Sequence, residues 1–198
     1  MNPNPEIGGL KAEVRAAMRA RLRILSVEEW KRQSALVADR IRSLREWDSA
    51  RWVGGYVPMR DEPDLVPLMR EAVASGRRVA VPAFDENSGE YGFREVRDWE
   101  RDLVPGKYGI GEPGKACAAV PVTWLDFVLV PGLAFDVRGG RLGRGKGFYD
   151  RLLASVVEAT CGVGSDEQLL SDVPVEAHDI RLNLVTVPGG LHGPGAIR

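Results

Sequence analysis

The sequence has little cysteine and little histidine, with two of each among its 198 residues. Cys117 and Cys161 do not share a C-x-x-C spacing, and no cluster of histidines lies near them. A zinc site or a disulfide framework is therefore not indicated, and a reducing cytoplasm is the expected location. No apolar run approaches the roughly 18 residues of a membrane span. Residues 1–6 lack the basic and apolar regions of a secretory signal.

An excess of charge of one sign is also missing, because 27 basic and 28 acidic residues leave a formal net charge of −1. This balance gives no overall field that would attract nucleic acid. The cations are unevenly placed, however, since residues 1–52 contain more basic than acidic side chains. A nucleic-acid-binding protein that uses this basic segment remains an alternative, although few aromatic residues are interleaved with the cations. We expect neither a nucleic-acid nor a membrane partner.

Apolar spacing predicts the order of helices and strands. Apolar residues recur every three or four positions over residues 10–25, which predicts a first helix, and Ser26 with Glu29 has the capping pattern of a second helix. The first 45 residues are therefore interpreted as a helical hairpin. The predicted strands cover residues 51–57, 78–83, 91–96, 126–130, 159–163 and 182–187, and further helices cover residues 64–74 and 148–157.

Strands that alternate with helices indicate the α/β class, with a layered, mainly parallel sheet that carries helices on both faces. The sequence shows no internal repeat, so we expect a single domain over residues 10–187. Residues 1–9 are expected to form a flexible N-terminus. Residues 188–198 are expected to form a flexible tail, because six of these eleven residues are glycine or proline.

The most informative segment is a loop rich in glycine and cations, which follows the predicted strand at residues 126–130. Its cations are Arg138, Arg141, Arg144, Lys146 and Arg151. Glycines let the backbone approach a ligand closely, and the N-terminus of the helix that follows adds partial positive charge. These features predict a loop that binds a polyphosphate. The alternative is a solvated basic loop whose glycines serve only its turns.

This loop matches the Walker A pattern only in part. Gly140 and Gly145-Lys146 have the required spacing, but Gly147 stands where a Ser or Thr hydroxyl would hold Mg²⁺. A standard P-loop NTPase is therefore not predicted. Asp150 is placed to supply the missing metal ligand, since Mg²⁺ prefers one or two carboxylates together with phosphate oxygens and water.

Residues 141–150 closely resemble the signature of the 5-formyltetrahydrofolate cyclo-ligase family, also called methenyltetrahydrofolate synthetase. Further segments that are similar to the family, in the right order, cover residues 11–15, 58–62, 108–113, 131–136 and 174–179. The resemblance spans about residues 10–187 and implies a fold like that of NagB, RpiA and the CoA transferases. It also implies a reaction in which ATP and Mg²⁺ convert 5-formyltetrahydrofolate to 5,10-methenyltetrahydrofolate. ADP and phosphate are released, and a phosphorylated formyl group is the intermediate.

The resemblance implies a role for each matched residue. The residues expected to bind ATP are Lys11, Arg15, Arg141, Leu142, Gly143, Arg144, Gly145, Lys146, Gly147, Phe148 and Tyr149, with Arg144 and Lys146 as the catalytic cations. The residues expected to bind the folate are Val57, Met59, Glu62, Tyr108 and Phe148. Asp150 and Asp179 are expected to hold Mg²⁺.

Each assignment has a structural alternative. Lys11 and Arg15 lie four positions apart and share one helix face, but a solvated basic helix has the same pattern. Asp61 and Glu62 fit an ordinary exposed loop, and Asp179 alone fits a loop acid. A non-catalytic folate- or nucleotide-binding protein of the same fold remains the alternative function, although a pair of acids opposite a basic loop favours the enzyme. We expect the protein to act as a monomer.

Overall fold

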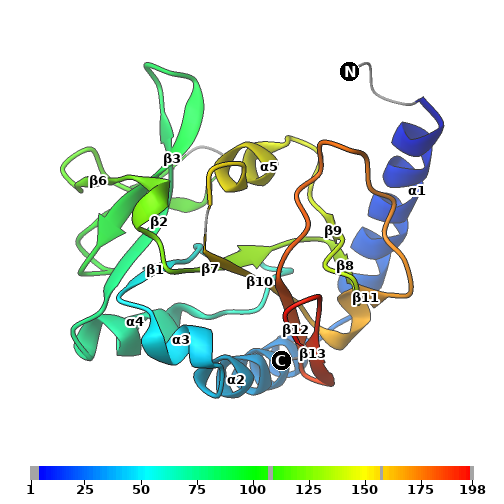
Figure 1. Ribbon diagram of the computed structural model, residues 1–198, viewed down its shortest axis with the longest axis horizontal. Coiled ribbons are helices and arrows are strands. Elements are labelled where there is room, and N and C mark those ends of the chain that lie inside the picture. Colours follow the sequence, from blue (N-terminus) through cyan, green and yellow to red (C-terminus); the bar gives the residue numbers. More distant parts are fainter. Residues whose placement is uncertain (1–4, 107–108, 157, 197–198) are drawn as a thin grey trace.

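A mainly parallel sheet forms the centre of the computed structural model, which describes residues 5–106, 109–156 and 158–196 (Figure 1). Its strands follow the order β13, β12, β10, β7, β1, β2, β3, β6. Their bounds are Trp52–Gly54 (β1), Arg78–Asp85 (β2), Glu90–Val96 (β3), Ala119–Val120 (β6), Phe127–Pro131 (β7), Ala159–Val163 (β10), Leu184–Val187 (β12) and Gly190–His192 (β13). The strands from β12 to β2 pair in parallel, whereas β13, β3 and β6 pair antiparallel at the two edges.

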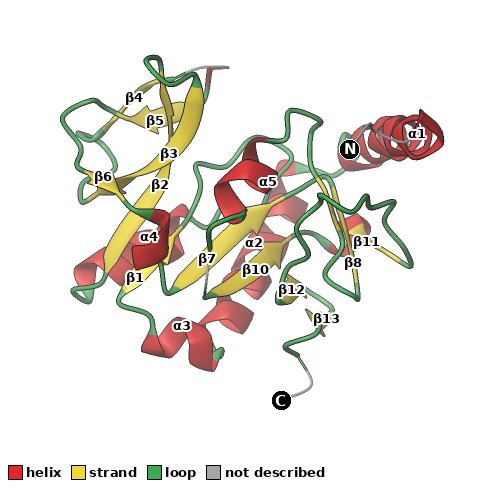
Figure 2. Cartoon of the chain, turned by 45° about the horizontal axis from the view of Figure 1, so that its top comes forward, coloured by secondary structure: helices red, strands yellow, loops and turns green. Residues whose placement is uncertain are grey.

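Helices cover both faces of this sheet, as predicted (Figure 2). Helices α2 (Val27–Arg42), α3 (Arg45–Ser49) and α4 (Val66–Ala74) pack on one face, and α5 (Phe148–Leu153) packs on the other. Strand β7 explains how both faces are filled, because successive side chains of a strand point to opposite sides. Phe127 and Leu129 join the core under α2–α4, while Val128 and Val130 join the core under α5.

The first helix, α1 (Pro5–Leu22), packs against a separate small sheet. That sheet consists of β8 (Ala134–Asp136), β9 (Arg141–Leu142) and β11 (Leu169–Leu170). Met18 and Leu22 of α1 are buried against Leu133 and Leu142, next to this sheet. The helical hairpin predicted for the first 45 residues is not confirmed: α1 lies at one side of the molecule while α2 runs beneath the central sheet (Figure 1), although Trp30 of α2 packs against the same cluster as Met18 and Leu22.

Described residues near both ends of the chain have regular secondary structure. Helix α1 begins at Pro5, so residues 5–9 are helical. Strand β13 lies within residues 188–198 and pairs with β12. Two further strands, β4 (Leu103–Pro105) and β5 (Gly111–Pro113), pair beside the β2–β3 hairpin. No helix among the described residues combines the length and apolar character that crossing a membrane requires.

Candidate active site

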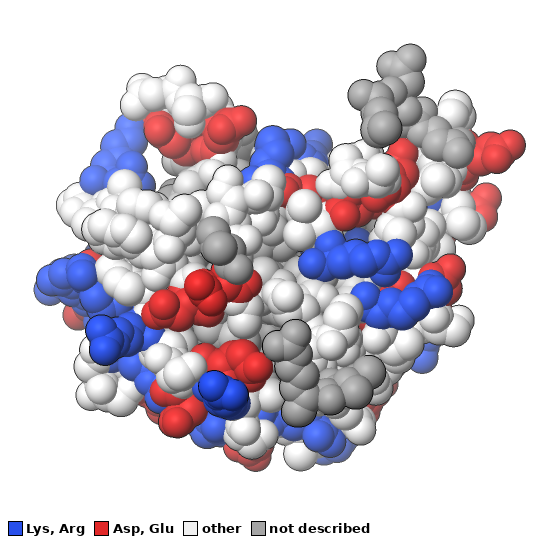
Figure 3. Space-filling view, in the orientation of Figure 1, with Lys and Arg blue, Asp and Glu red and all other residues white. Residues whose placement is uncertain are grey.

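A cavity of about 600 Å³ opens at the carboxyl ends of β1 and β7. This edge of a parallel sheet is where α/β folds bind their ligands. Most of its lining comes from α1, the loop after β1, strand β5, residues 141–150, which we call the basic loop, and the loop at residues 176–179. Figure 3 shows basic and acidic side chains interspersed over one face of the molecule, between larger uncharged areas.

The start of the basic loop is fixed by Asp136, which is fully buried. Its carboxylate accepts hydrogen bonds from the backbone N–H groups of Arg138 (2.8 Å), Gly140 (2.9 Å) and Val173 (3.1 Å). Gly139 has a φ of 83°, and a Cβ there would lie 2.1 Å from the carbonyl oxygen of Leu182. Only glycine fits at this turn, which connects β8 to β9 and so fixes where the basic loop begins.

Two arginines hold the rest of the basic loop in place. Nε of Arg15, on α1, donates to the carbonyl oxygen of Gly143 at 2.9 Å. Arg141 is buried, donates to Oδ1 of Asp150 at 2.9 Å and lies 5.4 Å from the centroid of the Tyr149 ring. The loop is therefore tied both to α1 and to the first turn of α5.

Lys11 of α1 is buried between two acids from the other end of the chain. Its Nζ lies 2.6 Å from Oδ2 of Asp179 and 2.8 Å from Oε2 of Glu176. Burial lowers the pKa of Lys11, but the hydrogen bonds to the two acids outweigh burial, so its pKa lies above the ordinary value. For Asp179, burial raises the pKa, but the hydrogen bonds from Lys11 and from the backbone N–H of Glu176, together with the charge of Lys11, outweigh burial, so the pKa lies below the ordinary value. Both groups are charged at neutral pH.

Arg144 lies between the basic loop and the loop that follows β1. Its Nη2 is 2.6 Å from Oδ1 of Asp61 and 3.1 Å from Oε1 of Glu62. The second oxygen of Glu62 accepts the backbone N–H of Met59 at 3.0 Å. Burial raises the pKa of Glu62, against the opposing effect of Arg144. Asp61 and Glu62 are therefore bound to a cation of the site and do not form a freely solvated loop.

The remaining wall of the cavity is apolar and aromatic. Val57, Met59 and Phe148, all predicted to bind folate, line it. Tyr91 lines it too: its ring centroid is 4.6 Å from that of Phe148, and its hydroxyl donates to Oε1 of Glu112 at 3.0 Å. Such a wall suits a flat ring system.

Asp150 and Asp179 both line the cavity, and their chemistry fits Mg²⁺. Oδ1 of Asp150 is bound to Arg141 and Oδ2 of Asp179 to Lys11, while Oδ1 of Asp179 lies 3.7 Å from Nε2 of His178. No group of three His, Cys, Asp or Glu side chains that could hold a metal occurs in the part of the chain that the structure describes. Two carboxylates suffice where phosphate oxygens and water complete the shell of Mg²⁺.

The cavity brings together every predicted site residue that the structure describes. They are Lys11, Arg15, Val57, Met59, Glu62, Arg141, Leu142, Gly143, Arg144, Gly145, Lys146, Gly147, Phe148, Tyr149, Asp150 and Asp179. The seventeenth, Tyr108, lies outside the described residues. Sequence reasoning gave no role to Tyr56, Tyr91, Glu112 or Glu176, which also line the cavity. Glu112 and Glu176 could have been found from the sequence, because both lie in segments that resemble the family, at residues 108–113 and 174–179.

Residues 8–188 match the sequence model of the 5-formyltetrahydrofolate cyclo-ligase family. The chain belongs to this family. A 5-formyltetrahydrofolate cyclo-ligase from Mus musculus is 29% identical over 190 residues, which cover 90% of this chain and 94% of that protein. One from Mycolicibacterium smegmatis is 34% identical over 154 residues, covering 71% and 75%.

Solved structures agree with the family assignment. The NMR structure of a 5,10-methenyltetrahydrofolate synthetase from Aquifex aeolicus superposes on this chain with a TM-score of 0.82 and 34% sequence identity. The match covers 93% of this chain and 92% of that protein. Membership of this ligase family favours an enzyme over a non-catalytic binding protein of the same fold. It also confirms the resemblance on which the site residues were chosen.

Proposed function

We propose that this protein cyclises 5-formyltetrahydrofolate to 5,10-methenyltetrahydrofolate and converts ATP to ADP and phosphate. One observation carries the proposal: a single cavity joins a cation-rich glycine loop to an aromatic wall with a buried glutamate, and Arg144 contacts both parts. A triphosphate and a flat, hydrogen-bonding ring system are the ligands that suit these two halves.

The chemistry explains why the reaction needs a nucleotide. The N5-formyl group is an amide, and an amide carbon is a poor electrophile. When its oxygen attacks the γ-phosphorus of ATP, ADP leaves and the formyl oxygen becomes part of a phosphate ester. N10 then attacks the formyl carbon, the C–O bond breaks, phosphate leaves and N10 loses its proton. This closure is intramolecular, so holding N10 near the carbon supplies much of the rate.

The cations of the cavity would bind and stabilise the phosphates. In this proposal Lys11, Arg15 and the backbone of residues 141–149 bind the triphosphate, while Arg144 and Lys146 meet the transferring phosphoryl group. Phosphoryl transfer asks a protein mainly for position and for positive charge around the moving group. Lys146 is the exposed member of this set and makes no ion pair within the described residues, so its charge is available to a ligand.

The folate would occupy the aromatic side. Glu62 would accept hydrogen bonds from the amino and ring N–H groups of the pterin. Val57, Met59 and Phe148 would contact the flat ring, and Tyr108 is proposed to stack on the substrate. Asp150 and Asp179 would hold Mg²⁺, which offsets the negative charge of the phosphate oxygens when it is bound.

Four broader statements belong to the same proposal. The fold is of the NagB, RpiA and CoA-transferase type, the protein works in the cytoplasm, and it acts as a monomer. It has no nucleic-acid or membrane partner, which the net charge of −1 and the mixed charges of Figure 3 support.

Absorbance tests the function directly. The protein is mixed with 5-formyltetrahydrofolate, Mg²⁺ and ATP, and the conjugated amidinium of the methenyl product is expected to give a new absorption band. The same mixture without ATP serves as the control and gives no band. A folded protein that binds the folate but produces no band with ATP would support the non-catalytic alternative instead.

A further inference from the structure

Arg144 is contacted by two neighbouring carboxylates that differ in their relation to the cavity. Glu62 lines the cavity, and its side chain is 6% exposed. Asp61 is not among the described lining residues, and its side chain is 27% exposed. Nη2 of Arg144 lies closer to Asp61, at 2.6 Å, than to Glu62, at 3.1 Å. One carboxylate therefore lines the ligand space, and the other contacts the arginine without lining the cavity.

The contacts of Glu62 create a competition once a ligand binds. Its Oε2 accepts the backbone N–H of Met59, and its Oε1 accepts from both Nε and Nη2 of Arg144. A ligand that donates hydrogen bonds to Glu62 competes with Arg144 for the acceptor sites of this carboxylate. Arg144, which is half-buried, then depends on its remaining anionic contact to stay where it is.

We propose that Asp61 is a positioning residue, which keeps the guanidinium of Arg144 at the border of the two half-sites while substrate occupies Glu62. The inference rests on the proposed function, because that function places the folate at Glu62 and the phosphates at the basic loop. Asp61 acts only through Arg144 and touches neither ligand. It lets one arginine change partners from Glu62 to the phosphoryl group without leaving the cavity.

The variant Asp61→Asn keeps the shape of the side chain and removes its charge. A hydrogen bond between charged groups is worth enough to change a rate by roughly tenfold or more. We expect kcat to fall about tenfold and the KM for ATP to rise. The KM for 5-formyltetrahydrofolate is expected to stay within about twofold, because Asp61 does not line the cavity. Asp61→Glu restores the charge and is expected to recover most of the lost rate.

A matched control comes from the same loop. Asp64 is exposed, and its carboxylate accepts the backbone N–H of Val66 at the start of α4, away from Arg144. Asp64→Asn removes one acid from the loop without touching the arginine. It is expected to leave kcat and both KM values unchanged.

A double-mutant cycle decides whether Asp61 works through Arg144. Asp61→Asn is made in the wild-type chain and in Arg144→Ala, and kcat/KM for ATP is measured in all four proteins. In the Arg144→Ala background we expect Asp61→Asn to have no further effect. An equal effect in both backgrounds would overturn the proposal, because it would mean that Asp61 merely stabilises its loop.

Calorimetry separates this inference from the proposed function. ATP binding is measured in the presence of a tetrahydrofolate that lacks the formyl group and so cannot react. We expect Asp61→Asn to weaken ATP binding several-fold in that complex and less in its absence. If the wild-type chain binds both ligands but turns nothing over, the proposed function fails and this binding difference still tests Asp61. Equal weakening with and without the folate contradicts the inference.

Discussion

Lys146 differs from the other cations of the cavity because it is exposed and makes no ion pair among the described residues. Lys146→Ala therefore removes a charge for ligands without leaving a buried partner behind. We expect turnover to fall about 10²- to 10³-fold, as when one group that stabilises transition-state charge is deleted. Thermal unfolding is expected to be unchanged. Lys115→Ala is the control, because it removes a lysine that pairs with Glu86 and does not line the cavity. We expect it to keep full turnover. Wild-type activity in Lys146→Ala would remove the catalytic role.

Asp150 has a structural partner as well as its proposed metal. Arg141 is buried, its Nε has no hydrogen-bond partner, and Asp150 is its anionic contact. Asp150→Asn is therefore expected to abolish turnover and also to lower the free energy of unfolding by about 1–3 kcal/mol. Urea unfolding checks the second effect. Asp172→Asn, at a surface pair with Arg138, is the control and should do neither. Normal turnover at saturating Mg²⁺ would contradict the metal assignment.

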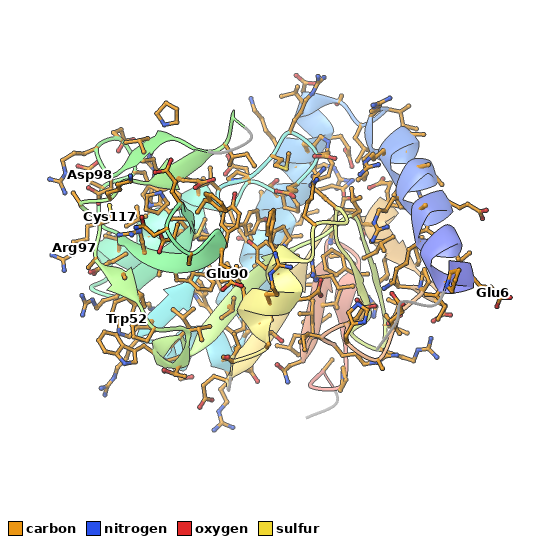
Figure 4. All side chains as sticks on the ribbon, turned by 90° about the horizontal axis from the view of Figure 1, so that it is seen from above. Glu6, Trp52, Glu90, Arg97, Asp98 and Cys117 are labelled. Carbon is orange, nitrogen blue, oxygen red and sulfur yellow. The ribbon has the colours of Figure 1, made fainter. Side chains whose placement is uncertain are left out.

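At the scale of the elements, Glu95 of β3 is connected through Arg78 of β2 to the ring of Trp52 on β1. It is buried and accepts hydrogen bonds from Arg78 and Arg97, and Arg78 lies 4.1 Å from the ring centroid of Trp52. Figure 4 labels Trp52 and Arg97 on the side of the molecule away from Glu6 on α1. The bond from Arg78, together with that from Arg97, lowers the pKa of Glu95 to about 2.

This lowered pKa predicts how stability depends on pH. The ionised form of Glu95 is favoured in the folded chain, so its contribution is complete above the ordinary pKa of 4.5 and is lost as the pH falls toward 2. Glu95→Gln is expected to reduce the free energy of unfolding by about 1–2 kcal/mol at pH 7, a range reduced because both arginines are exposed. The difference from the wild type should shrink between these two pH values. Glu90→Gln, at an exposed position of the same strand, should show no such difference.

The elements that the sequence predicted best are those whose pattern is local. Residues 159–163 were predicted as a strand and form β10 with the same bounds, because a short apolar run in a buried strand has few alternatives. The predicted N-cap of α2 is also present, with the Ser26 hydroxyl accepting the Glu29 N–H at 3.1 Å. The site residues emerged together for a similar reason, because most of them lie within ten consecutive positions of the basic loop.

The elements that the sequence could not predict depend on distant partners. The apolar face of α1 was clear from its spacing, but the spacing does not name what covers it. Met18 and Leu22 are buried with residues 133 and 142, more than a hundred positions away, and of α2 only Trp30 is among the hydrophobic residues that pack against this cluster. The role of Asp61 was hidden for the same reason, since its partner Arg144 is 83 positions further along the chain.

At the scale of the whole molecule, the C-terminal residues complete the edge of the central sheet. Strand β13 pairs with β12, the Gly193 N–H donates to Val137, and the Gly195 N–H donates to Asn183. A chain that ends at residue 187 loses these bonds and uncovers β12. We expect its free energy of unfolding to be lower by about 2–3 kcal/mol, measured by urea unfolding. Stability equal to that of the full chain would show that the tail does not contribute, as its composition had suggested.

The ion pair between Lys11 and Asp179 joins residues that are 168 positions apart. During synthesis, at about 5–20 residues per second, Lys11 leaves the ribosome many seconds before Glu176 and Asp179, the two acids that pair with it. Lys11 of helix α1 therefore has neither of its acidic partners until the last fifth of the chain has been synthesised. A nascent chain interrupted before that point contains every lysine and arginine of the phosphate half-site. It lacks the segment at residues 176–179 that completes the lining of the cavity.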